Sequence, residues 1–202
     1  MDDTQVWQTI DSERAATADL LAGLTEVEWT YPSLCEGWTV REVAAHLSLA
    51  HRISVGGAFK AFVRARGSFN RLVDQTARDE ARRPTAELVS ELRGAVGLHR
   101  LAPGQTLKNA LLDTLVHAQD IALPLGVERH MPTDAAVVVA DDLWRMGFPF
   151  HARRRLAGHR LTATDADWSV GEGAEISGPI EALVMLLAGR TATIPRLTGI
   201  TV

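Results

Sequence analysis

The amino-acid sequence predicts a mainly α-helical protein, with a helical bundle over residues 1–150 followed by a small α/β subdomain over residues 151–202. Apolar residues recur at three- and four-residue spacing through most of the first range, which is typical of amphipathic helices. After about residue 160 the pattern changes to alternating apolar and polar residues interrupted by glycine, which is typical of short strands. At 202 residues the chain is long enough to bury a sizeable core.

The first predicted helix covers residues 4–24, and the second begins after Thr39. Thr39 and Glu42 form the T-x-x-E pattern of a capping box, which satisfies free amide groups at a helix N-terminus. Trp38 stands just before this helix, in the position of a hydrophobic staple. His46 falls within the apolar arc of the helix, so we expect its imidazole to point inward.

The middle of the chain gives weaker signals. We expect residues 58–65 to be helical with Phe59 and Phe62 facing inward. The stretch 67–83 is polar and poorly periodic, and it gives the weakest signal in the chain. Pro84 then opens a further helix, because proline is well suited to the first positions of a helix.

The later elements have clearer limits. Residues 107–122 are apolar around almost the whole helical circumference, which predicts a central helix packed on most sides. Another helix is expected over 132–147. Short strands are expected in "RLTATD" and "DWSVGEGAEISG", and a final helix runs from Pro179 to a C-terminal cap at Gly189.

Composition excludes several classes of function. The net charge of −4 argues against a nucleic-acid partner, because such binding depends on excess lysine and arginine. A single cysteine, Cys35, excludes an internal disulfide and indicates a reducing, cytoplasmic location. We find no basic leader and no stretch of the ~18 apolar residues that a membrane helix requires, so no membrane partner is expected.

Three ionisable residues interrupt the central apolar helix, at Asp113, His117 and Asp120. Their spacing places them on one helical face. A carboxylate and an imidazole four residues apart can reach one cation, and a histidine from a facing helix would complete a two-histidine, one-carboxylate site with an open position. His46 is the natural third residue. We therefore predict that His46, Asp113 and His117 bind a divalent metal, with Asp120 as a supporting or alternative ligand.

A plainer interpretation stays open. Asp113 and His117 could be a local hydrogen-bonded pair and His46 a core histidine, because D-x-x-x-H recurs by chance. The argument for a metal is energetic, since a buried ionised carboxylate is costly unless it is paired or metal-bound. Cys35 is expected to be a small buried apolar residue rather than a reactive thiol.

Three blocks of the chain resemble the mycothiol-dependent maleylpyruvate isomerase family, which belongs to the DinB-like superfamily. They are "PSLCEGWTVREVAAHL" at 32–47, "LLDTLVHAQDIALPLG" at 111–126 and "TATDADWSVGEGAEISGPIEALVMLLAGR" at 162–190. The blocks occur in the family's order and extend over most of the chain.

The resemblance implies a DinB-like four-helix bundle that binds a divalent metal, usually zinc, through one histidine of the first block and an E-x-x-x-H pair on a later helix. His46 and His117 match the two histidines, while Asp113 stands where the family's characterised enzyme has the longer glutamate. Asp120 could assist or replace Asp113. The implied chemistry is activation of a low-molecular-weight thiol, mycothiol, for S-transfer or cis-trans isomerisation of a small electrophile.

Trp38 and Arg52 are expected to line the pocket, and Arg153, Arg154 and Arg190 are further candidates to pair with substrate carboxylates. The leading interpretation is a metal-dependent enzyme whose partners are a thiol and a small electrophile, with the oligomeric state, a homodimer included, left open. One alternative is a non-catalytic metal-binding or stress-response protein that keeps the bundle. Another is an Fe(II) oxygenase, because two histidines and a carboxylate also form that site.

Overall fold

The computed structural model describes residues 1–200 and divides into two compact units. The N-terminal unit comprises Asp3–Glu128, and the C-terminal unit begins at Arg129. The sequence analysis placed this division after residue 150. In the structure the division falls earlier because α8 (Thr133–Arg145) packs its buried face against α10 (Ile180–Leu187) and so joins the C-terminal unit.

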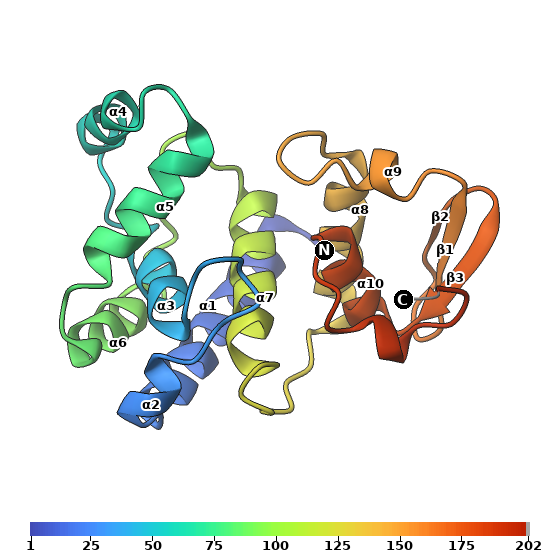
Figure 1. Ribbon diagram of the computed structural model, residues 1–202, viewed down its shortest axis with the longest axis horizontal. Helices are drawn as coiled ribbons and strands as arrows, with labels where there is room; N and C mark the ends of the chain where they lie inside the picture. Colours follow the sequence, from blue (N-terminus) through green and yellow to red (C-terminus); the bar gives the residue numbers. More distant parts are fainter. Residues whose placement is uncertain (201–202) are drawn as a thin grey trace. The chain divides into compact units, whose positions relative to one another are not determined.

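The N-terminal unit is helical throughout. Its helices are α1 (Asp3–Ala22), α2 (Glu26–Trp29), α3 (Val40–Leu49), α4 (Val55–Arg64), α5 (Phe69–Glu80), α6 (Thr85–Gly94) and α7 (Leu107–Ala122). Helices α1, α3, α6 and α7 form a four-helix bundle, in which α1 and α3 each pack against both α6 and α7 (Figure 1). The fully buried part of the core shared by α1, α3, α6 and α7 includes Leu21, Val43, Leu88 and Ile121.

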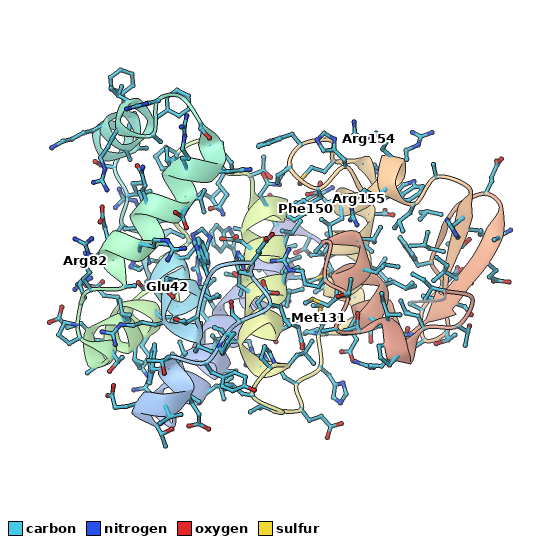
Figure 2. All side chains as sticks on the ribbon, in the orientation of Figure 1. Glu42, Arg82, Met131, Phe150, Arg154 and Arg155 are labelled. Carbon is cyan, nitrogen blue, oxygen red and sulfur yellow. The ribbon has the colours of Figure 1, made fainter. Side chains whose placement is uncertain are left out.

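Capping interactions define the two helices that matter most for function. Glu42, labelled in Figure 2, lies at the start of α3. Its carboxylate accepts a hydrogen bond from the Thr39 backbone N–H at 2.8 Å, and both halves of the capping box are present. Thr106 and Asn109 form a second capping box at the start of α7. The predicted capping box at Thr39 and the predicted limits of the central helix are therefore confirmed, and α7 is buried along most of its length.

The middle of the chain holds one element that the sequence left undefined and one expectation that is wrong. The poorly periodic stretch 67–83 contains α5, whose N-terminus is capped by the Ser68 side chain. Only Ala77 of this helix is buried, and its apolar residues stand in a strongly polar stretch. They nevertheless follow the i, i+3, i+4, i+8 spacing of an amphipathic helix; they are Phe69, Leu72, Val73 and Ala77. Phe59 and Phe62 lie on a helix as expected, but they are 69% and 43% exposed rather than inward-facing.

The C-terminal unit is a small α/β structure, which confirms the predicted fold class of a helical bundle followed by an α/β subdomain. It contains α8, α9 (Ala152–Arg155), β1 (His159–Ala163), β2 (Ser169–Gly171), β3 (Ala174–Gly178), α10 and a 3-10 turn at Ile194–Arg196. The strand order is β2-β1-β3, with β2 antiparallel and β3 parallel to β1. Leu161 at the centre of β1 is paired with Val170 and Ile176.

Within residues 1–200, no helix combines the length and the apolar character needed to cross a membrane.

Candidate functional site

His46, Asp113 and His117 converge where α3 faces α7. The Nε2 atoms of His46 and His117 each lie 3.3 Å from Oδ1 of Asp113. The two imidazole rings meet edge to face, with their centroids 5.0 Å apart. The structure therefore brings together the three residues that the sequence singled out as metal ligands, from positions 67 residues apart in the chain.

The spacing of these atoms fits a metal ion. Zinc bonds of about 2.0–2.1 Å in a tetrahedral site place neighbouring nitrogen and oxygen ligands about 3.3 Å apart. The two observed N···O separations of 3.3 Å match this value. As hydrogen bonds they would be long, since N–H···O distances centre near ~2.9–3.0 Å. Two imidazole nitrogens and one carboxylate oxygen are also a donor set that suits zinc and other divalent transition metals.

Asp120 lies behind His117, away from the shared Asp113 oxygen. His117 Nδ1 and Asp120 Oδ2 are 2.9 Å apart, and the Asp120 side chain is fully buried. A carboxylate at Nδ1 keeps the proton on that nitrogen and leaves the Nε2 lone pair directed at Asp113. The backbone N–H of Leu34 donates to the Asp120 carbonyl at 3.2 Å, which ties the loop before α3 to α7. Asp120 therefore occupies the position of an orienting group.

Cys35 is the residue whose environment the sequence analysis misjudged. It is half-buried and packs against the bundle core, but its Sγ also lies 3.0 Å from Asp120 Oδ2 and 3.5 Å from His117 Nδ1. The thiol thus adjoins the histidine and its orienting carboxylate. Only the position of Cys35 in the loop before α3 hinted at this contact, because sequence spacing does not relate that loop to α7.

The charged side chains of the site are paired with one another. Burial alone would raise the pKa of Asp113, but the two imidazoles outweigh burial and hold that pKa well below its usual range. Burial alone would lower the pKa of His117, but hydrogen bonds with Asp113, Asp120 and Cys35 outweigh it and raise that pKa. The carboxylates that interrupt the apolar helix are thus each paired with an imidazole.

The cluster of His46, Asp113 and His117 is partly exposed to solvent and has Trp38 on one side. The side chains of His46, Asp113 and His117 are 19%, 22% and 14% exposed, so a small molecule can approach them. The Trp38 ring lies beside His46 with a centroid separation of 5.6 Å, and its Nε1 donates to Asp74 of α5 at 2.9 Å. Trp38 therefore forms a fixed wall next to the cluster.

The arginines proposed as anion partners have different environments. Arg52 pairs with Glu80 at 2.7 Å and Glu91 at 3.3 Å, so the structure engages its guanidinium with carboxylates of other helices rather than with the histidine cluster. Arg190 donates to the Ala188 carbonyl. Arg153 and Arg154, on α9 near Arg155 (Figure 2), line an open surface pocket of about 280 Å³ in the C-terminal unit.

Comparisons with known proteins agree with these features. A family model described as the mycothiol maleylpyruvate isomerase N-terminal domain matches residues 10–102, a range that contains His46 and ends before α7. No curated protein sequence matches the chain.

Two solved structures share its fold. The crystal structure of the mycothiol-dependent maleylpyruvate isomerase superposes with a TM-score of 0.68 at 14% identity, covering 100% of this chain and 95% of the other. A histidine-to-alanine mutant of that isomerase superposes with a TM-score of 0.66 at 14% identity and the same coverage. The family model thus covers the N-terminal part of the chain, and the two solved structures share the fold over its whole length.

Proposed function

We propose that the protein is a metal-dependent enzyme in which His46, Asp113 and His117 hold a divalent ion, zinc in the first instance. Its substrates would be a low-molecular-weight thiol, mycothiol, and a small electrophile. The observation that carries this proposal is the pair of 3.3 Å separations from two histidine Nε2 atoms to one Asp113 oxygen. The family-model match over residues 10–102, which include His46, supports the same assignment.

The proposed chemistry divides between the ion and the chain. A bound divalent ion supplies the positive charge that turns a coordinated thiol into a thiolate near neutral pH. Asp120 orients His117, and Trp38 closes one side of the site. The three ligands are partly exposed, so a thiol could reach the bound ion. Addition of the thiol sulfur to an electrophilic carbon gives S-transfer, whereas addition, bond rotation and loss of the thiol give cis-trans isomerisation.

The substrate is inferred only as a class. The solved relatives are named as maleylpyruvate isomerases, and at 14% identity they support the fold rather than a particular substrate. We therefore propose a small electrophile with an activated double bond or a comparable carbon centre. Cytoplasmic location is part of the same proposal, because the single thiol Cys35 and a thiol cosubstrate both suit a reducing compartment.

The test begins with metal analysis of protein purified without a histidine tag. We expect about one equivalent of zinc or a similar divalent metal in the wild type and a large loss in His46→Ala. His99→Ala is the matched control, because His99 is a half-exposed histidine of the same unit that stacks on Trp7 and pairs with Asp11. Equal metal content in the two variants, or none in the wild type, would reject the metal site.

Activity is then tested by following thiol consumption with a panel of electrophiles, and isomerisation by a change in substrate absorbance. Turnover that falls in His46→Ala and persists in His99→Ala would support the enzyme. Bound metal without turnover across the panel would instead support the second candidate, a non-catalytic metal-binding or stress-response protein. That alternative is favoured by Asp113, which is one methylene shorter than the glutamate of the characterised family enzyme.

A further inference from the structure

Helix α4 carries a face of large apolar side chains that is exposed in the structure. Of the eleven large apolar residues that are exposed within residues 1–200, five lie in the fifteen residues from Val55 to Phe69. Four of the five are on α4 itself. We call these four the α4 apolar face; they are Val55 at 75%, Phe59 at 69%, Phe62 at 43% and Val63 at 60% exposure.

A different side of α4 packs against the rest of the N-terminal unit. Helix α4 packs on α5, at the edge of the N-terminal unit (Figure 1). Its less exposed residues are small: Ala58 and Ala61 are half-buried, and Ala65 just after the helix is buried. At about 100° per residue these alanines share one side, while the α4 apolar face lies beside it within an arc of about 100°. The bulky residues are therefore not needed for packing α4 against its own unit.

The charge of the segment is strongly one-sided. Between Arg52 and Val73 there are five cationic residues and no carboxylate, although the net charge of the whole chain is −4. Arg52 and Arg64 are paired with carboxylates of other helices. Lys60, Arg66 and Arg71 are exposed, and they form no ion pair within residues 1–200. Unpaired cations next to an exposed apolar face favour a partner that is both anionic and apolar.

We propose that α4 binds the surface of an anionic phospholipid bilayer, with the α4 apolar face in the interface and Lys60, Arg66 and Arg71 against the headgroups. Amphipathic helices with apolar and aromatic residues on one face and lysine or arginine beside them bind membranes in this way. Lys60 is on α4, Arg66 follows it, and Arg71 is on α5. The sequence analysis expected no membrane partner because the chain lacks a spanning segment, but a helix lying in the interface needs none. This inference is independent of the proposed metal site.

The area of the α4 apolar face favours a bilayer over a second copy of the chain as its partner. With ~150–250 Å² for an aromatic side chain, the exposed fractions give an apolar area on the order of 400 Å². A stable dimer buries about 800 Å² on each partner, so the face is too small to form one by itself. The cationic residues would also repel their counterparts if two α4 faces met around a twofold axis.

The experiment is co-sedimentation of the full-length protein with phosphatidylcholine vesicles and with vesicles that also contain phosphatidylglycerol. We expect binding to the mixed vesicles that weakens with added salt, because lipid charge contributes to it. The double variant Phe59→Ser/Phe62→Ser should bind at least about tenfold more weakly. Lys60→Glu should also weaken binding by at least about tenfold, because the reversal removes one attraction to the anionic headgroups and adds a repulsion.

Two matched controls use the rest of the chain. Phe148→Ser removes an exposed phenylalanine of the C-terminal unit, and Lys108→Glu reverses the chain's other lysine. Both should bind like the wild type, and all variants should keep its melting temperature. The proposal is overturned if the wild type does not bind mixed vesicles, if the controls lose as much binding as the α4 variants, or if analytical ultracentrifugation shows a dimer that Phe59→Ser/Phe62→Ser dissociates.

Discussion

At the scale of single residues, Asp120 shows how a buried carboxylate can orient a partly exposed imidazole. Its side chain is fully buried and contacts His117 and Cys35, neither of which is fully buried. The contact at His117 Nδ1 determines which ring nitrogen can donate its lone pair to a metal. The ligating ability of His117 therefore depends on a residue that no substrate would touch.

Asp120→Asn tests this dependence. Replacing the carboxylate by a neutral amide weakens its hold on His117, and comparable changes behind metal-bound histidines lower metal affinity by about 10–100-fold. Competition with a chromophoric chelator measures the affinity. Asp19→Asn is the control, because Asp19 lies on α1 in an exposed pair with Arg93. Equal affinities in the two variants would show that Asp120 has no orienting role.

Glu181 gives a pH-dependent prediction in the C-terminal unit. Burial alone would raise its pKa, but hydrogen bonds from the Arg196 guanidinium, the Met131 backbone N–H and the His130 ring outweigh burial and lower it. Because the folded-state pKa lies below the ordinary value of 4.5, the resulting stabilisation is complete above pH 4.5 and is lost as the pH falls through the lowered value.

Glu181→Gln should therefore destabilise the protein by about 1 kcal/mol at neutral pH, after allowance for solvent screening. The difference from the wild type should shrink as the pH is lowered from 7 towards 3. Melting temperatures recorded across that range measure it. A difference that stays constant with pH would show that the carboxylate charge is not the source of the stability.

At the scale of elements, a close backbone approach constrains the sheet of the C-terminal unit. Gly173 precedes β3 with φ +118°, and a Cβ there would overlap the carbonyl oxygen of Gly158. Gly158 also has a positive φ, of +82°, but a Cβ added to it would meet no atom within 4 Å. The two glycines share an unusual backbone and differ in the space around them.

Gly173→Ala should consequently cost at least about 2 kcal/mol more than Gly158→Ala, because both substitutions strain φ and only the first also creates a clash. Chemical denaturation of the two variants gives the comparison. Similar losses of stability would mean that the backbone at Gly173 relaxes enough to accept a side chain.

At the scale of the whole molecule, all three proposed ligands belong to the N-terminal unit. A ligand that binds only the folded state stabilises the elements that carry its site. Metal removal should therefore act on α3 and α7 and should leave β1–β3 unaffected.

Hydrogen exchange followed by mass spectrometry, with and without a chelator, tests this expectation. Amides of α3 and α7 should exchange at least about tenfold faster after chelation, and those of β1–β3 should not change. The same experiment on His46→Ala is the control, since chelation should have no effect on protein that does not hold the metal. Faster exchange in β1–β3 of the wild type would contradict the assignment of the site to one unit.

Local features of the fold could be predicted from the sequence because they depend on residues close together in the chain. The capping box at Thr39, the limits of α7 and the shared face of Asp113 and His117 all follow from spacing within one or two helical turns. Helix α5 has the same kind of local signal, since Phe69, Leu72 and Val73 share one helical face, but the polar residues around them obscure it.

The sequence by itself determined the helical bundle with its α/β appendage, and it singled out His46, Asp113, His117 and Asp120. Only the tertiary structure decided that two imidazole nitrogens share one carboxylate oxygen, that Cys35 joins them, and that the large side chains of α4 face outward. Periodicity specifies the face of a helix on which a residue lies. The neighbour that this face meets depends on the packing of helices that are distant in the sequence.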